Sequence, residues 1–310
     1  RTWLDQHLKG RWGAVPDREY TSEELESISH YALHHRKEKF YVDDITWNDL
    51  GLEEIFMLLN NTVSSCGEEY LYYMLRTPEQ KREVLLAREE LMEWFRTHPG
   101  ERLQLQKIFY EIRKTNLSLS DYIDILKDIP RKKTGFYKVL ALCPLVSIGA
   151  IFLDPALGVI LLLSALVVNG IVHHRDSQEI EKYLKCYQCI LSLVRASDKI
   201  GKWKLEDPVL RPYFDRILEG RHGLKGFRRG AWLVADNNDV RDDIASVFLS
   251  YVKIFFHADL IKFYSMLDQL DGHEASLELL MENIGLLDAC IGAASYREYL
   301  SLYLSLIHIS

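Results

Sequence analysis

The sequence predicts an all-α fold, and three observations lead to this prediction. Helix-breaking residues are sparse: the chain has eight prolines, and the 41 residues from Ala231 to Asp271 contain neither glycine nor proline. Within that run apolar side chains recur every three or four residues, for example at Val240, Ile244 and Val247, which is the period of a helix. Strand-like alternation and hairpin turns are nearly absent, and the Asp-Gly pair at 271–272 follows a helical stretch rather than linking two strands.

Capping residues mark three helix starts. Thr21–Glu24 has the spacing of a capping box, in which the two end residues satisfy backbone N–H groups reciprocally. Ser65–Glu68 has the same spacing and predicts a second capped helix. Thr77 stands directly before Pro78, which predicts a third helix with proline at its first position, where the missing N–H group costs nothing.

The composition indicates a folded, acidic protein. Hydrophobic residues make up 48% and charged residues 27% of the chain, and these proportions exclude a disordered chain. Acidic residues outnumber lysine and arginine by 45 to 38, so we expect DNA to bind, if at all, at a local basic patch. The five cysteines have no regular spacing, which indicates a reducing compartment and no disulfide framework.

One segment is apolar enough to enter a membrane. Residues 139–172 carry a single charge, Asp154, and the following Pro155 would break the helix there. Each arm would have roughly 15–18 residues, or about 22–27 Å, slightly less than a bilayer core of about 30 Å. Basic flanks on both sides predict that the rest of the chain faces the cytoplasm at the cell membrane. These flanks contain Arg131, Lys132, Lys133, Lys138, His173, His174 and Arg175.

The alternative is a helical hairpin buried in the centre of a soluble bundle. Helices of soluble cores are normally amphipathic, whereas both arms are apolar on all sides, which favours a hairpin that spans the membrane or re-enters it. Ser147, Ser164 and Asn169 do not argue against the membrane, because such side chains can hydrogen-bond between helices or back to the backbone.

The cysteine and histidine pairs do not predict a metal site. Cys186 and Cys189 lie in an amphipathic helical pattern without a second pair at zinc-binding spacing, so we expect them in the core. The histidine pairs at 34–35 and 173–174 also lack partners at ligand spacing and are expected on the surface.

The motifs of common catalytic sites are also absent from the sequence. It contains no G-x-S-x-G nucleophile elbow. Gly201-Lys202 lacks the upstream glycine of a P-loop and precedes Trp203 instead of serine or threonine. We therefore expect no catalytic residue, nucleotide site or cofactor within this chain.

A glycine-rich basic stretch is the candidate DNA contact. Glycines at positions 220, 223, 226 and 230 would let its basic side chains approach phosphate groups. Four aspartates follow between positions 236 and 243, so a solvated loop paired with the next helix is the alternative. The candidate contacts are Arg221, Lys225, Arg228 and Arg229.

Two blocks of the sequence resemble the helical core of the MutS family, the DNA mismatch-repair ATPases. The start of that core is similar to the block from residue 43, DDITWNDLGLEEIFMLLNNTVSSCGEEYLYYMLRTP, and to the EQKREVLLAREELMEWF that follows. The segment that closes the core before the ATPase domain is similar to LLMENIGLLDACIGAASYREY. The matching positions are Asn61, Thr62, Gly67, Leu71, Leu75, Pro78, Arg88, Leu91, Leu287, Asp288 and Ala294.

The matching positions are expected to be structural rather than catalytic. Gly67 lies inside the predicted Ser65–Glu68 cap, where a side chain would crowd the turn. Leu71 and Leu75 are four residues apart and share one face of the predicted helix.

The chain departs from the family pattern in two ways. Only 42 residues precede the core, too few for the family's mismatch-reading domain with its Gly-x-Phe-Tyr-Glu motif. Phe109-Tyr110-Glu111 lies inside a later helical stretch and lacks the glycine, so we interpret it as coincidence. The apolar hairpin does not belong to the standard repair protein either, and the whole resembles a shortened, membrane-associated branch of the family found in bacteria. The resemblance therefore does not imply that this chain recognises DNA mismatches.

The apolar segment and the resemblance together divide the chain. They indicate an N-terminal helical segment (1–42), a first part of the core (43–134), the hairpin (135–175) and lever helices with a second part of the core (176–303). Residues 304–310, LSLIHIS, are similar to the translation of a common sequencing adapter. We therefore expect that they are not native and that the natural chain continues into a P-loop ATPase domain.

The resemblance also implies a function. The core would couple the missing domain, which would bind ATP and Mg²⁺, to DNA or another partner at the membrane, in a homodimer. The alternative is a non-catalytic helical membrane scaffold or interaction protein that keeps the shape of the core. A third possibility is a soluble repair protein with a buried hairpin.

Overall fold

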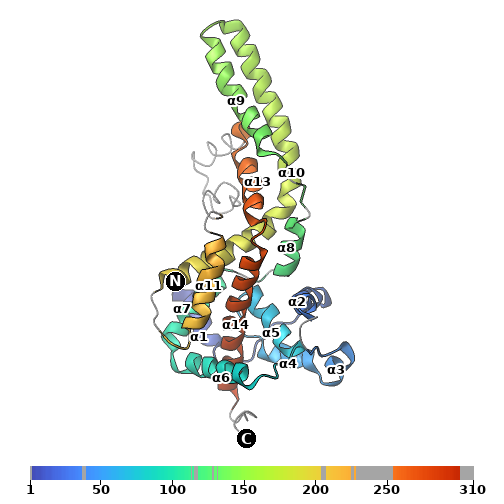
Figure 1. Ribbon diagram of the computed structural model, residues 1–310, viewed down its shortest axis with the longest axis vertical. Coiled ribbons are helices and arrows are strands. Elements are labelled where there is room, and N and C mark those ends of the chain that lie inside the picture. The colour runs from blue at the N-terminus through green and yellow to red at the C-terminus, as the bar shows by residue number, and fades with distance from the viewer. Residues whose placement is uncertain are drawn as a thin grey trace. The chain divides into compact units, whose positions relative to one another are not determined.

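The described part of the chain is entirely helical (Figure 1). The computed structural model describes residues 2–36, 40–112, 114, 118–127, 129–130, 132–203, 207–224, 227 and 254–300. No strand occurs within these ranges, which confirms the predicted all-α class. The helices are α1 (Thr2–Arg11), α2 (Ser22–His34), α3 (Asp44–Asp49), α4 (Leu52–Leu59), α5 (Ser65–Arg76), α6 (Arg82–Thr97), α7 (Pro99–Tyr110), α8 (Leu119–Lys127), α9 (Thr134–Ile151), α10 (Pro155–Lys202), α11 (Arg211–Gly223), α13 (Ala258–Leu270) and α14 (Glu274–Tyr299).

The chain divides into two compact units. The core unit consists of Arg1–Asp124, Ser192–Gly223 and Ala275–Ser310. The hairpin unit consists of Ile125–Leu191 and Leu224–Glu274. Helix α10 contributes residues to both units.

Helix α2 starts as its capping sequence predicts. The Thr21 hydroxyl accepts a hydrogen bond from the backbone N–H of Glu24 (3.2 Å), and the Glu24 carboxylate accepts one from the backbone N–H of Thr21 (2.9 Å). This cap involves only residues within one turn of helix, so its sequence pattern is sufficient to predict it.

Of the two other predictions, a capped helix does begin at Ser65 but without the predicted capping box, and the helix start at Thr77-Pro78 is wrong. Helix α5 is capped by Ser64, whose hydroxyl accepts from the Gly67 N–H (3.1 Å), and Glu68 is bound by groups from elsewhere in the core unit instead of reaching back. Thr77 ends α5 instead of opening the next helix, since its hydroxyl donates to the Tyr73 carbonyl oxygen (2.6 Å). Helix α6 begins at Arg82, four residues after Pro78.

The long periodic run that ends at Asp271 is interrupted at His257. This residue has φ +50°, in the left-handed region that a non-glycine side chain rarely adopts, and α13 starts at the next residue. Residues 231–253 of the run lie outside the described residues, so the prediction of a helix there is not tested.

Helix α5 lies at the centre of the core unit. Its buried residues occupy every side of the helix, from Ser65 to Tyr73 and again at Arg76. Helix α2 packs on one side, where Tyr31 meets Tyr70 and Tyr73 with ring centroids 6.1 and 5.5 Å apart. Helix α14 packs on another, and its Gly285 lies so near that an added Cβ would come 2.6 Å from the Cys66 carbonyl oxygen.

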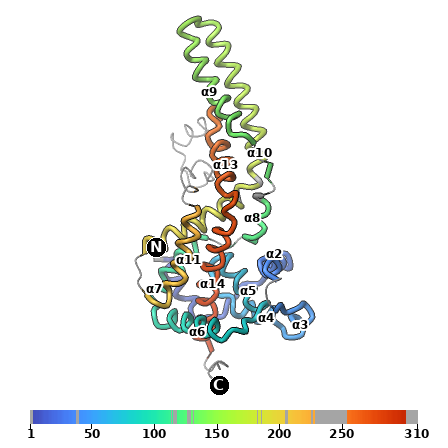
Figure 2. Tube along the Cα trace, in the orientation of Figure 1, coloured from blue at the N-terminus to red at the C-terminus, as the bar shows by residue number. Residues whose placement is uncertain are grey.

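The apolar segment forms two antiparallel helices, α9 and the first part of α10, which lie side by side in Figure 1. The helix breaks at Phe152–Asp154, as the Asp-Pro pair predicts, and Figure 2 traces this turn. The Asp154 carboxylate caps α10 by accepting from the backbone N–H groups of Ala156 (3.0 Å) and Leu157 (3.2 Å). Helix α10 then continues without a break to Lys202.

Both helices are long and apolar enough to cross a membrane. Their apolar windows, Thr134–Ile151 and Pro155–Glu181, have mean hydropathies of 1.6 and 2.3. Only 17% and 11% of these windows are buried in the structure. The core helices of a soluble bundle would be mostly buried, so the described part of the chain gives no support to the alternative of a buried hairpin.

Candidate functional site

The two sequence blocks that resemble the MutS core meet at one buried contact, which we call the Ser64–Asp288 junction. The Asp288 carboxylate on α14 accepts hydrogen bonds from the backbone N–H groups of Val63 (3.1 Å) and Ser64 (2.9 Å). It also accepts one from the Ser64 hydroxyl (2.5 Å). Asp288 therefore acts as a second, non-local cap for the N-terminus of α5, where the partial positive charge of the helix favours an anion.

Gly67 is the position that lets Asp288 come so close. A Cβ added to Gly67 would lie 2.2 Å from Asp288 Oδ2 and 2.6 Å from its carboxyl carbon. A side chain would indeed crowd this position, but the neighbour that it would meet is Asp288 rather than the turn itself.

Burial sets the charge state of the junction. It raises the pKa of Asp288 to about 6, against the opposing effect of the hydrogen bonds from Ser64. The junction is thus a buried acid whose ionised form is held by N–H and O–H donors, and no other polar side chain reaches the carboxylate among the hydrogen bonds of the described residues.

The Asn61-Thr62 turn forms hydrogen bonds with residues near both ends of the chain, on α1 and α14. The Asn61 amide nitrogen donates to the Arg11 carbonyl oxygen (2.6 Å) and to the Ser295 hydroxyl on α14 (2.8 Å). Its amide oxygen accepts from the Arg11 guanidinium (3.0 Å). The Thr62 hydroxyl donates to the Asn60 amide oxygen (2.6 Å), so each side chain of the turn has a structural partner.

A buried polar cluster surrounds Glu68 one turn into α5. Its Oε1 atom accepts from Tyr20 (2.5 Å), Asn60 (2.8 Å) and Lys114 (2.8 Å), and from Arg18 (3.2 Å). Burial alone would raise the pKa of Glu68, but the charges of Lys114 and Arg18 outweigh it and the pKa is lowered. This carboxylate is ionised and paired.

The adjacent Glu69 has the opposite character. It accepts hydrogen bonds from the Ser118 hydroxyl (2.8 Å) and the Leu119 backbone N–H (2.9 Å) at the start of α8. No cation is paired with it among the described residues, and burial raises its pKa to about 8. At neutral pH this carboxyl is therefore mostly protonated.

Neither glutamate was singled out by the sequence motifs. A signal was present, however, since α5 is apolar or aromatic on all its faces in the run from Tyr70 to Leu75. A helix without a polar face is buried on all sides, so acidic residues in its first turn must be buried as well.

The remaining resemblance positions differ in burial. Leu71, Leu91, Leu287 and Ala294 are fully buried, Leu75 is half-buried and Pro78 is exposed. Arg88 on α6 is also buried, and the described residues provide no hydrogen-bond partner for its Nε atom. The structure therefore brings most of these positions into one core, with Pro78 outside it.

The candidate DNA contacts are placed only in part. Arg221, near the end of α11, forms an ion pair with Asp198 on α10. Lys225, Arg228 and Arg229 lie outside the described residues. Arg221 is thus next to a carboxylate that partly neutralises it, and the proposed basic patch as a whole is not tested.

The basic flanks of the hairpin are also partly neutralised. At its base, Lys132 pairs with Asp176 (3.1 Å) and Glu179 (2.5 Å), and the Tyr137 hydroxyl donates to the buried Asp176 (2.7 Å). Arg175 also contacts Asp176 (3.0 Å). Of the other basic residues of the flanks, Lys133, Lys138 and His174 are exposed, and Arg131 lies outside the described residues. The flanks are therefore a mixed polar network rather than an uninterrupted basic surface.

The histidine pairs are only partly on the surface. His34 and His174 are exposed as predicted, but His173 and His35 are half-buried, and each of these two contacts a carboxylate. His173 lies 3.0 Å from Asp259, and His35 lies 2.8 Å from Glu278.

Cys186 and Cys189 are buried in the hairpin unit, as predicted. Burial raises the pKa of Cys186 to about 11, so this thiol remains protonated and unreactive at neutral pH. Within the described residues no group of three potential ligands could hold a metal ion.

No protein-family model matches the chain, and no curated protein or solved structure is significantly similar to it. The resemblance to the MutS core therefore rests on the quoted sequence blocks.

Proposed function

We propose that this chain anchors a MutS-like helical core to a lipid bilayer through the α9–α10 hairpin. In this proposal the core unit couples an ATP-binding domain outside this sequence to DNA or to another partner at the membrane. The observation that carries the membrane part is the exposed apolar surface of both hairpin arms.

The exposed surface is too apolar to be stable in water. Phe152 and Leu153 at the tip are 85% and 90% exposed, and large aliphatic side chains continue along both arms. Apolar patches of this kind mark membrane or protein contacts. Helix α9 has 18 residues and would be about 27 Å long, close to the thickness of a bilayer core.

The hairpin shape places both of its ends on one side of the bilayer. The exposed Lys133, Lys138 and Arg175 near these ends favour the cytoplasmic side. Asp154 at the tip is the one charge within residues 139–172, so a hairpin that enters from the cytoplasm carries a single acidic residue to the far side.

The Ser64–Asp288 junction supports the MutS part of the proposal. Ser64 and Asp288, one in each resembling block, are 224 residues apart in the sequence, yet they meet through hydrogen bonds in one buried core. If the two blocks belong to one folded core, this direct contact is the expected result.

Membrane fractionation tests the anchor. Ile160→Lys together with Leu163→Lys puts two charges on exposed positions of α10, at a cost of about 5–7 kcal/mol in a bilayer. The matched control, Ile45→Lys with Leu50→Lys, changes two equally exposed apolar residues of the core unit. We expect the wild type and the control to stay with membranes after an alkaline carbonate wash and the hairpin variant to be released.

A wild-type chain that stays in the supernatant without detergent would contradict the anchor. Equal release of the hairpin variant and the control would contradict it as well.

The Arg221–Asp198 ion pair favours a second candidate, a membrane scaffold that has lost DNA binding. Measuring DNA binding by the intact protein at increasing salt concentration distinguishes the two functions. Binding that falls steeply with salt and weakens in an Arg228→Ala, Arg229→Ala variant supports the MutS-like function. No salt-dependent binding supports the scaffold.

A further inference from the structure

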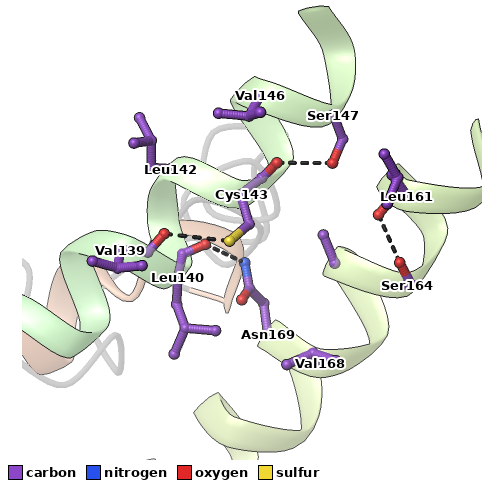
Figure 3. A pocket seen from close by; sticks show the side chains of 11 residues that line it. Val139, Leu140, Leu142, Cys143, Val146, Ser147, Leu161, Ser164, Val168 and Asn169 are labelled. Atoms are coloured by element: carbon purple, nitrogen blue, oxygen red, sulfur yellow. Dashed lines mark hydrogen bonds between the residues drawn. The ribbon is translucent and has the colours of Figure 1, made fainter. Parts of the chain in front are cut away.

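A groove lies between α9 and α10 in the apolar part of the hairpin (Figure 3). Its volume is about 440 Å³, which is within the range of small-molecule binding sites. Aliphatic side chains such as Val139, Val146 and Leu161 form most of its lining. In the bilayer proposed above, such a groove would be open to lipid.

The hydroxyl and thiol donors in the groove are already used within their own helices. The Ser147 hydroxyl donates to the Cys143 carbonyl oxygen (2.8 Å), and the Ser164 hydroxyl donates to the Leu161 carbonyl oxygen (2.9 Å). The Cys143 thiol donates to the Val139 carbonyl oxygen (3.4 Å). The groove therefore offers a ligand acceptor atoms rather than donors.

Among the described polar side-chain atoms of the groove, Asn169 Oδ1 is the one that is buried and makes no hydrogen bond. Its amide nitrogen donates to the carbonyl oxygens of Leu140 (3.1 Å) and Phe255 (2.9 Å), which fixes the orientation of the amide. Its Oδ1 atom is buried and has no hydrogen-bond partner in the described part of the chain. An acceptor buried without a donor is costly, and more so where no water is present, so this position favours a ligand with an O–H or N–H group.

The polar end of the groove lies close to exposed cations. Asn169 is one helical turn before His173 and about 9 Å along the helix from Arg175. Lys138 directly precedes Val139, which lines the groove. The side chains of Lys138 and Arg175 are both exposed. Basic residues between membrane helices on the cytoplasmic side attract anionic lipid headgroups.

We propose that this groove binds one anionic glycerophospholipid with a free hydroxyl in its headgroup. One acyl chain lies along the aliphatic lining, the phosphate lies near Lys138 and Arg175, and the headgroup folds back so that its hydroxyl donates to Asn169 Oδ1. Because Asn169 is fully buried, a neighbouring side chain of the groove turns aside as the headgroup binds. This inference rests on the proposed membrane anchor.

The test uses the full chain reconstituted in vesicles of equal parts phosphatidylglycerol and phosphatidylcholine. After extraction in a mild detergent, native mass spectrometry counts the lipids that remain bound to each chain. We expect one phosphatidylglycerol to be retained, at about fivefold higher occupancy than phosphatidylcholine, as for one hydrogen bond to the headgroup.

A variant with a filled groove and a matched control variant distinguish lipid bound in the groove from lipid bound elsewhere on the hairpin. Ala165→Trp puts a large ring into the groove, whereas Val167→Trp puts the same ring on an exposed position of α10 that does not line it. We expect the first variant to lose the bound lipid and the second to retain it. Lys138→Gln should lower the preference for phosphatidylglycerol.

Equal lipid retention by the two tryptophan variants would overturn the inference, as would equal occupancy by the two lipids. A second copy of the chain in place of a lipid would also overturn it. These results are distinguishable from failure of the anchor, because in each of them the chain is still recovered from the membrane fraction.

Discussion

Replacing Gly67 with alanine is expected to destabilise the core unit, although alanine normally stabilises a helix. The new Cβ would lie 2.2 Å from Asp288 Oδ2, well inside the van der Waals distance of a non-bonded carbon and oxygen, so the carboxylate must move. It would then lose its hydrogen bonds from Ser64 and Val63.

The magnitude follows from these contacts. Loss of the cap costs about 1–2 kcal/mol, and leaving the buried carboxylate with fewer donors costs about 1–3 kcal/mol more. The helix propensity of alanine offsets about 0.5–1 kcal/mol of this. We therefore expect Gly67→Ala to lower the free energy of unfolding by about 1–4 kcal/mol.

The assay is urea-induced unfolding of the detergent-solubilised chain, followed by circular dichroism. Gly100→Ala is the matched control, because an added Cβ there has nothing within 4 Å, and it should be neutral or stabilising by up to about 1 kcal/mol. In an Asp288→Gly background the Oδ2, carboxyl carbon and Cβ atoms that the new side chain would meet are all absent, so Gly67→Ala should cost little, giving a coupling of about 2 kcal/mol between the two sites. Equal effects of the two glycine variants, or additive effects of Gly67→Ala and Asp288→Gly, would refute the reasoning.

Two further predictions concern charges in the core unit. Glu69 has a folded-state pKa of about 8 against an ordinary value of 4.5, so the folded state binds the extra proton and stability falls as pH rises between these values. In Glu69→Gln the amide oxygen can accept from the Leu119 N–H and the amide nitrogen can donate to the Ser118 hydroxyl oxygen, as a protonated carboxyl would, so the variant should remove up to about 1.4 kcal/mol of this loss per pH unit. The difference in pH slope between the wild type and Glu69→Gln, measured by unfolding titrations between pH 6 and 8, isolates this effect from the other groups that titrate there; an unchanged pH slope would contradict it. Arg297 forms a two-bonded ion pair with Glu89 (2.7 and 2.6 Å) that joins α14 to α6, so Arg297→Gln should cost about 1 kcal/mol, less at high salt. Arg96→Gln breaks a more exposed pair on α6 and should cost about half as much or less, and a reversed order in thermal unfolding would count against this assignment.

Local sequence patterns predicted the helices well where their causes are local. The cap at Thr21 depends on residues within one turn, and it forms as predicted. The predicted capping box at Ser65–Glu68 does not form, because Ser64 and Glu68 are engaged by distant groups such as Asp288 and Lys114. Thr77 ends α5 instead of opening a helix, since its hydroxyl donates to the Tyr73 carbonyl oxygen. The break at His257 had no local signal, since neither glycine nor proline is present there.

The polar side chains of the hairpin also form the kinds of hydrogen bond that the sequence predicted. Ser147 and Ser164 bond back to their own helices, and Asn169 bonds across to α9, as expected for polar groups in an apolar segment. The groove that these helices enclose could not be predicted, because its width depends on how the two helices pack.

The sequence by itself determined the helical class, the apolar hairpin with its break at Asp154, and the two blocks that resemble one core. These properties depend on periodicity and composition, which are readable along a single stretch of chain. Only the tertiary structure showed that Asp288 caps α5, that Glu68 is ionised while Glu69 is mostly protonated, and that Arg221 is paired with Asp198. The physical reason is that the charge and role of a buried polar group are set by its neighbours in space, and here those neighbours come from distant parts of the sequence.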